Sequence, residues 1–228
     1  PEPRTIGSFA KGRQLVAGNF LFAGYLIEAP NASIWALKAP NAAFEGDLHG
    51  FAWMDDLAAV GDTFSRASMQ SWLWEWIAQF GRGSGAGWTP DLTGRRLIRW
   101  INHALFVLRG QESDRSDAFY LSLAQQTTFL SKRWHSASPG LPRFEALTGL
   151  IYAGLSLQGM EGLAKPAIKA LAKECADQVD SEGGLPARNP EELLAVYALL
   201  TWVAAALEEA GLEVPAEHLG AIERITPT

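Results

Sequence analysis

Basic and aromatic residues alternate with apolar ones between Trp88 and His103, so this segment is a candidate binding site. If the segment is helical, its core face consists of Leu97, Ile98, Ile101, Ala104, Leu105 and Leu108. Two adjoining stripes then carry Arg95, Arg99 and Asn102, and Arg96, Trp100 and His103. Guanidinium groups bind carboxylate or sulfate through paired hydrogen bonds, and an indole ring offers a flat apolar surface. The pattern predicts a site for an anionic ligand, with candidate binding residues Trp88, Arg95, Arg96, Arg99, Trp100 and Arg143.

A second interpretation of the same cluster is purely structural. The arginines could pair with acids such as Asp91, and the tryptophans could fill the core. Trp88 follows a loop with four glycines, Gly81–Gly87, where an aromatic side chain could close over a ligand. That loop lacks the lysine and the Ser or Thr that a phosphate-binding loop needs.

Two residues are candidates for acid–base chemistry, although each also has a packing interpretation. His103 could act as a base, because imidazole titrates near neutrality. Tyr152 shares a helical stripe with Glu145, Thr148 and Ser156 and could act as an acid. No Ser–His–Asp order or metal triad is found, so the catalytic residues stay undetermined at this point.

Composition excludes several classes of protein. The 228 residues carry a net charge of −6, which argues against general nucleic-acid binding. One cysteine and four scattered histidines predict no disulfide framework, no metal site and no cofactor. Between Arg82 and Arg143, nine basic residues face only four acidic ones, so an anionic ligand could still be attracted locally.

Apolar runs and the N-terminus limit where the protein can reside. The longest apolar run, Leu193–Leu207, includes Thr201 and predicts a buried core helix, so no membrane partner is expected. No signal peptide is recognisable, which leaves a cytoplasmic or periplasmic location open. The chain lacks an initiator methionine, so we expect a processed chain or a fragment.

Helical periodicity dominates after residue 42. Helices are predicted over 43–60, 63–80, 90–109, 113–134, 142–160, 164–179, 191–210 and 215–225. In the second of these, Phe64, Met69, Leu73, Trp76, Ile77 and Phe80 are expected on one buried face. Ala-Gly between two apolar runs predicts a β-hairpin over 19–28. The expected organisation is an N-terminal extension, 1–42, and a curved array of antiparallel helical hairpins, 43–228.

Several short motifs resemble the N-terminal helical domain of the heparinase II/III-like polysaccharide lyases. They are Gly83-Ser84-Gly85-Ala86-Gly87-Trp88 leading into Arg96-Leu97-Ile98-Arg99-Trp100, the early hairpin followed by Ile34-Trp35, Ser138-Pro139-Gly140, and Asp180-Ser181-Glu182-Gly183-Gly184. The resemblance covers most of residues 15–211. It implies an all-α fold, an incomplete (α/α) toroid, followed in that family by a β-sandwich domain that is absent here. It also implies β-elimination of uronate-containing polysaccharides in the cleft between the two domains.

The sequence departs from the family at the catalytic positions. Leu141-Pro142-Arg143 replaces an Asn-Asn-His run, and Asn189-Pro190-Glu191-Glu192 stands where the catalytic tyrosine is expected. The resemblance therefore implies an anionic polysaccharide as partner, together with the missing C-terminal domain, but an inactive isolated chain. One alternative is a non-enzymatic helical scaffold that docks a protein partner or its own missing domain. Another is an α/α-barrel glycoside hydrolase that uses Asp91 and Glu192.

Overall fold

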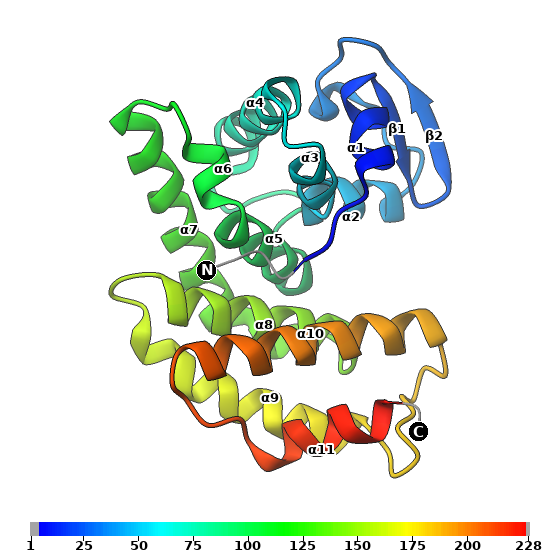
Figure 1. Ribbon diagram of the computed structural model, residues 1–228, viewed down its shortest axis with the longest axis vertical. Helices are drawn as coiled ribbons and strands as arrows, with labels where there is room; N and C mark the ends of the chain where they lie inside the picture. Colours follow the sequence, from blue (N-terminus) through cyan, green and yellow to red (C-terminus); the bar gives the residue numbers. More distant parts are fainter. Residues whose placement is uncertain (1–4, 227–228) are drawn as a thin grey trace. The chain divides into compact units, whose positions relative to one another are not determined.

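A computed structural model describes residues 5–226 and shows a predominantly helical chain with one small sheet (Figure 1). The helices are α1 (Phe9–Val16), α2 (Ala42–Gly50), α3 (Trp53–Val60), α4 (Thr63–Phe80), α5 (Pro90–Asn102), α6 (Ala104–Leu108), α7 (Ser113–Arg133), α8 (Leu141–Ser156), α9 (Ala164–Gln178), α10 (Pro190–Glu209) and α11 (Ala216–Ile225). The strands are β1 (Asn19–Phe22) and β2 (Tyr25–Glu28). The predicted all-α fold class with a short N-terminal hairpin is confirmed.

The chain divides into two compact units, and each is described by itself. The first comprises the described residues up to Trp88 together with Arg99–Gln126. The second comprises Thr89–Ile98 and the described residues from Thr127 onward. The chain passes between the units at three points: just before α5, within α5 and within α7. The predicted boundary at residue 42 is none of these points and stays a prediction.

The hairpin forms where the sequence predicts it. β1 and β2 are antiparallel, with Asn19 opposite Glu28 and Phe22 opposite Tyr25. The two turn residues, Ala23 and Gly24, have φ of 49° and 80°, the left-handed pair that a tight hairpin needs. Phe20 on the inner face is fully buried, with its ring centroid 5.8 Å from that of Trp72.

Helix α1 in the first unit was not predicted. Its N-cap is Ser8, whose hydroxyl accepts a hydrogen bond from the Lys11 backbone. The helix packs against α3 at close range, because a Cβ on Gly12 would collide with the backbone carbonyl of Asp56. The backbone N–H of Ser8 also donates to Asp56 Oδ1 at 2.7 Å, which fixes the N-terminal segment on α3.

Two of the predicted helices are interrupted. The helix expected over 43–60 breaks at Phe51, which adopts a left-handed conformation with φ of 60°. The helix expected over 90–109 breaks at His103, and the chain re-enters a helix at Ala104. As a result Leu105, predicted in the core, is 86% exposed. Phe64, predicted on a buried face, is also exposed because it lies in the first turn of α4.

The second unit is built from helical hairpins. α8 packs against α9 and α10, and α11 packs against α9 and α10. All residues from Phe144 to Gly154 of α8 are buried, so this helix is the centre of the unit. The single cysteine, Cys175 on α9, is also buried, and burial raises the pKa of its thiol to about 12.

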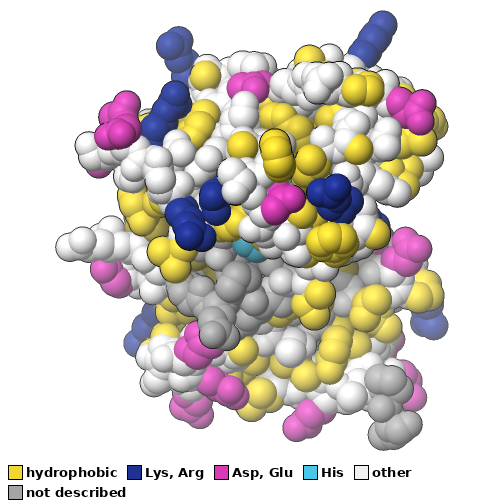
Figure 2. Space-filling view, turned by 45° about the horizontal axis from the view of Figure 1, so that its top comes forward, with side chains coloured by type: hydrophobic (Ala, Val, Ile, Leu, Met, Phe, Trp, Pro, Cys, Tyr) yellow, Lys and Arg dark blue, Asp and Glu magenta, His cyan; other side chains and the backbone are white. Residues whose placement is uncertain are grey.

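Helix α10 is the one helix of the described residues that is long and apolar enough to cross a membrane. Length and composition alone set that criterion, and core helices of soluble proteins also meet it. About a third of its apolar window is buried, and Leu194 on its outer side is 68% exposed. It is therefore less buried than the sequence predicted. Hydrophobic side chains also reach the surface shown in Figure 2, among charged ones.

Candidate functional site

The predicted site residues divide between the two units. Trp88, Arg99, Trp100 and His103 belong to the first unit, and Arg95, Arg96, Arg143 and Tyr152 belong to the second. Whether all of them line one cleft therefore stays a prediction. Within each unit, hydrogen bonds, ion pairs and burial define what each side chain does.

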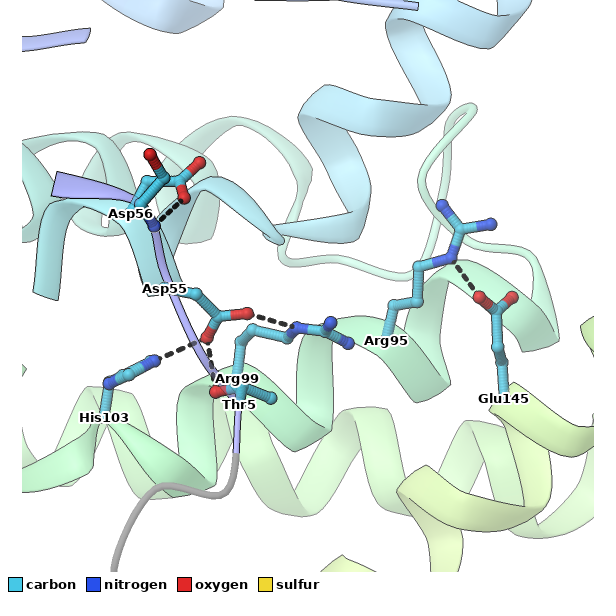
Figure 3. A network of polar contacts seen from close by, with 8 residues as sticks. Thr5, Asp55, Asp56, Arg95, Arg99, His103 and Glu145 are labelled. Atoms are coloured by element: carbon cyan, nitrogen blue, oxygen red, sulfur yellow. Dashed lines mark hydrogen bonds and ion pairs between the residues drawn. The ribbon is translucent and has the colours of Figure 1, made fainter. Parts of the chain in front are cut away.

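A buried carboxylate organises the polar residues of the first unit (Figure 3). Asp55 on α3 is 7% exposed. Its Oδ1 accepts hydrogen bonds from Thr5 Oγ1 at 2.6 Å and from His103 Nε2 at 2.7 Å. Its Oδ2 pairs with Arg99 Nε at 3.2 Å. Three segments far apart in sequence are thus joined by one side chain.

The pKa values of the two adjacent aspartates of α3, Asp55 and Asp56, are shifted in opposite directions. Burial by itself raises the pKa of Asp55, but the His103 hydrogen bond, the Arg99 charge and the Thr5 hydroxyl outweigh it, so the pKa lies below its usual value. At Asp56, burial outweighs the hydrogen bond from the Ser8 backbone, so its pKa is raised. Asp55 is therefore an ionised anchor at neutral pH. It orients His103 as a hydrogen-bond donor through Nε2.

The two tryptophans of the predicted site have different environments. Trp100 is fully buried, with its ring stacked on Phe119 at a centroid distance of 5.5 Å. The expectation that Trp100 offers a flat apolar surface to a ligand is corrected, because its ring has no exposed face. Trp88 is half-buried, stacks on Trp76, and donates from Nε1 to the carbonyl of Phe80 at 2.6 Å. Trp88 therefore keeps surface that a ligand can reach, beside the exposed loop that precedes it.

Two arginines of the second unit are partly exposed and already paired. Arg95 Nε lies 2.7 Å from Glu145 Oε1, and 27% of the Arg95 side chain is exposed. Arg143 lies 3.4 Å from Glu174 Oε2 and donates to the carbonyl of Ala137 at 2.7 Å. The carboxylate-pairing alternative is thus observed for both arginines, with Glu145 and Glu174 as partners. A ligand carboxylate would have to share or displace these contacts.

Arg96 and Tyr152 are buried in the second unit. Arg96 is 0% exposed, contacts Thr93 Oγ1 at 3.3 Å, and burial lowers the pKa of its guanidinium to about 9. Tyr152 on α8 is 2% exposed. The expectation that Arg96 contacts a ligand is corrected, because no part of its side chain reaches the surface. Tyr152 as an acid would require the packing around α8 to open.

The acidic residues that hold the arginines were not predicted from the sequence. Asp55, Glu145 and Glu174 lie between 31 and 50 positions from their arginine partners. The sequence held a signal for Asp55 alone, which is an acidic residue directly after two large apolar ones, Trp53-Met54. Among the residues that the structure describes, no three His, Cys, Asp or Glu side chains are grouped so as to hold a metal ion.

Comparisons with known proteins give one related sequence and several related folds. No protein-family model matches the chain. FtsZ-localized protein C from Caulobacter vibrioides is 27% identical over 232 residues, which cover 99% of this chain and 39% of that protein. The chain therefore spans about two fifths of the length of this curated relative.

Solved structures of heparinases share the fold. A structure of heparinase III superimposes with a TM-score of 0.76 at 15% identity, over 97% of this chain and 38% of that chain. A mutant of the heparan sulfate lyase HepC from Pedobacter heparinus gives 0.72 at 19% identity, over 95% and 37%. The resemblance of the chain to a helical domain of heparinase-type lyases is thus confirmed at the level of fold.

Proposed function

We propose that this chain is a helical domain that binds an anionic, uronate-containing polysaccharide and belongs to a longer, heparinase-like protein. The observation that carries the proposal is the fold, which matches heparinase III over 97% of the chain. A domain of this type supplies a surface for the sugar chain, while the rest of the larger protein supplies further contacts. The partner domain is part of the proposal, because the chain spans 37–38% of these lyases.

The residues proposed to contact the glycan are those with accessible surface. In the first unit, Trp88 offers a half-buried indole at the end of the glycine loop, which also carries the exposed Arg82. In the second unit, the side chains of Arg95 and Arg143 are partly exposed, at 27% and 23%. Because both arginines are already paired with carboxylates, each gains little from an additional anion. The expected affinity is therefore weak.

We expect millimolar to high-micromolar dissociation constants for an acidic oligosaccharide, which correspond to about −4 to −6 kcal/mol. Isothermal titration with a uronate oligosaccharide and a neutral one of equal length measures this. Trp88→Ala should weaken both sugars by removing the stacking surface. The double variant Arg95→Gln/Glu145→Gln should weaken only the acidic sugar, because it removes the cation without changing the net charge.

The salt dependence of the affinity is a further test of the proposal. Affinity for the acidic sugar should fall as salt rises, because the ionic contacts are exposed and the screening length shortens to about 8 Å at physiological strength. The neutral sugar should be unaffected. If the wild-type domain binds neither sugar, glycan binding is contradicted.

We expect no β-elimination by the chain alone. In the resembling family, an Asn-Asn-His run and a tyrosine perform this step, and here Leu141-Pro142-Arg143 and Asn189-Pro190-Glu191-Glu192 occupy those places. The product of elimination carries a C4–C5 double bond conjugated to the uronate carboxylate, which absorbs in the ultraviolet. Incubation with heparan sulfate or alginate should leave this absorbance flat. An increase that His103→Ala abolishes would contradict the prediction and identify His103 as a base.

A second candidate function is a non-enzymatic scaffold that docks a protein partner. It is favoured by the sequence relative named for its localisation with FtsZ, which matches 99% of this chain. Under this proposal the domain contributes to recruitment by FtsZ. Co-sedimentation of the purified chain with FtsZ polymers, compared with bovine albumin, tests it. Sedimentation at the albumin level would oppose this candidate.

A further inference from the structure

A cavity of about 440 Å³ lies in the first unit, between the end of α1, the segment after β2, and α4. A volume of this size is in the range of small-ligand sites. The lining residues of α4 share one face of the helix, because they are spaced three or four positions apart: Ser68, Ser71, Trp72 and Glu75. Asn31 and Ser33 line the cavity from the segment after β2. None of the functions considered above uses this cavity.

Glu75 is the one charged residue of the described lining. Its Oε1 accepts a hydrogen bond from Ser71 Oγ at 3.1 Å, and its Oε2 accepts one from Ser33 Oγ. Glu75 and Ser33 are half-buried and Ser71 is exposed, so a ligand can reach this group of side chains. Within residues 5–226 Glu75 forms no ion pair, so its negative charge is matched by two hydroxyls and by no cation.

The directions of these hydrogen bonds specify the chemistry of a ligand. A serine hydroxyl has one hydrogen to donate, and both Ser33 and Ser71 donate it to Glu75. Their oxygens, like those of the carboxylate, can therefore only accept further hydrogen bonds. A primary ammonium group complements such a site, since it carries a positive charge and three donors and accepts nothing. An anionic ligand would be repelled by the carboxylate.

The rest of the cavity indicates what the ammonium group is attached to. Asn31 contributes an amide and Ser68 a hydroxyl, and within residues 5–226 neither side chain forms a hydrogen bond. Both groups can donate as well as accept, so hydroxyl groups of a ligand complement them. A divalent metal ion fits less well, because it takes six or more oxygen ligands, several of them carboxylates, and Glu75 is the one carboxylate of the described lining.

We propose that this cavity binds a small hydroxylated primary amine, whose ammonium group pairs with Glu75 beside Ser33 and Ser71. The proposal is independent of the binding of uronate glycans, which are anions. The probe is glucamine, the amine derived from sorbitol, added to the full chain at neutral pH and followed by nitrogen–proton NMR correlation spectra. Trp35 reports binding, because its backbone and indole N–H groups donate to Ser33 Oγ and to the Trp72 carbonyl. We expect both signals to shift saturably, with a millimolar dissociation constant.

Two matched probes separate the charge from the hydroxyl groups. Sorbitol carries a hydroxyl in place of the ammonium group and should bind at least about tenfold more weakly, because hydrogen bonds between ionised groups are the stronger ones. Ethylammonium chloride carries the charge without the polyol and should bind about threefold more weakly, because it leaves Asn31 and Ser68 to water.

Variants distinguish ligand binding from folding. Glu75→Gln keeps the size of the side chain and removes its charge, so it should retain the melting temperature and lose glucamine binding at least about tenfold. Ser71→Ala removes one acceptor at an exposed position and should weaken binding about threefold, which tests the site even if Glu75→Gln lowers the melting temperature. Glu45→Gln is the matched control, because Glu45 is a half-buried carboxylate on α2 outside the cavity lining; it should leave glucamine binding unchanged.

Four results would overturn the proposal. Equal binding of sorbitol would make this a site for neutral polyols. The same saturable shift with potassium chloride, at the concentrations used for glucamine, would make it a site for simple monovalent cations. Unchanged glucamine binding in Glu75→Gln would show that the carboxylate does not recognise the ammonium group. Absence of a saturable shift in the wild type would show that water alone fills the cavity.

Discussion

Replacing Asp55 by alanine is expected to lower the free energy of unfolding by about 3–5 kcal/mol, the usual cost of removing one partner of a buried ion pair. The carboxylate holds Arg99 and His103, whose side chains are only 12% and 5% exposed. Without it, the largely buried Arg99 guanidinium loses this ion pair and the Thr5 hydroxyl loses this acceptor. Urea denaturation followed by far-ultraviolet circular dichroism measures the difference.

The matched control is a carboxylate in an exposed ion pair. Asp177 pairs with Lys173 one turn away on α9, with side chains 49% and 75% exposed. Exposed pairs of this kind contribute between zero and about 1 kcal/mol. Asp177→Ala should therefore cost much less than Asp55→Ala. Equal costs would show that the Asp55 cluster is not an energetic centre of the first unit.

The Asp55 cluster also predicts how stability depends on pH. Because the pKa of Asp55 is lowered in the folded state, its contribution is present above the unfolded value of about 3.9 and is lost as pH falls through the folded pKa. Asp56 acts in the opposite sense, since its raised pKa makes its contribution fall as pH rises through that pKa. Comparing Asp55→Asn with the wild type isolates the first effect. The free energy of unfolding should fall less steeply with decreasing pH in the variant than in the wild type.

Local chemistry made parts of this fold predictable. Asp62 is a typical N-cap residue ahead of α4, and its carboxylate accepts from the Ser65 backbone at 2.7 Å. Asn189 before Pro190 similarly caps α10. Ala23-Gly24 determines the position of the hairpin. Each of these signals acts between residues a few positions apart, and local sequence patterns are informative over that distance.

The helix breaks were not predictable from the same kind of signal. Phe51 and His103 end helices without a glycine or proline at either position. Phe51 tolerates its left-handed backbone because its ring is held between Trp53, Trp76 and Trp100. Such support comes from tertiary packing, and a periodicity argument does not contain it.

The site was harder to predict than the fold for a related reason. The stripe that adjoins the core face of the helix over 90–109 made Arg96 and Trp100 candidate binding residues, but both are fully buried. The helix is packed on more than one side, so a polar residue on it is not thereby exposed. The acids that pair with Arg95 and Arg99 come from α8 and α3, which no local spacing could identify.

Gly94→Ala is expected to lower the free energy of unfolding by about 3 kcal/mol, at the upper end of the usual cost of overpacking. In the second unit, Gly94 of α5 lies directly against α8. A Cβ on Gly94 would collide with the backbone carbonyl of Glu145, and a Cβ on Gly149 would lie 2.5 Å from the Cα of Gly94. Backbone atoms cannot rotate away as a side chain can, so the helices must separate. This loss should exceed the roughly 1 kcal/mol that alanine gains in helix propensity.

The control and the coupling test use the same type of substitution. A methyl group on Gly162 would have no other atom within 4 Å, so Gly162→Ala should change stability by less than about 1 kcal/mol, in the stabilising direction.

Gly149→Ala should be costly alone, but the double variant Gly94→Ala/Gly149→Ala should cost less than the sum of the two. The first methyl already separates α5 from α8, and the second then enters space that has been opened. Strict additivity in thermal and urea unfolding would contradict direct contact between the two glycines.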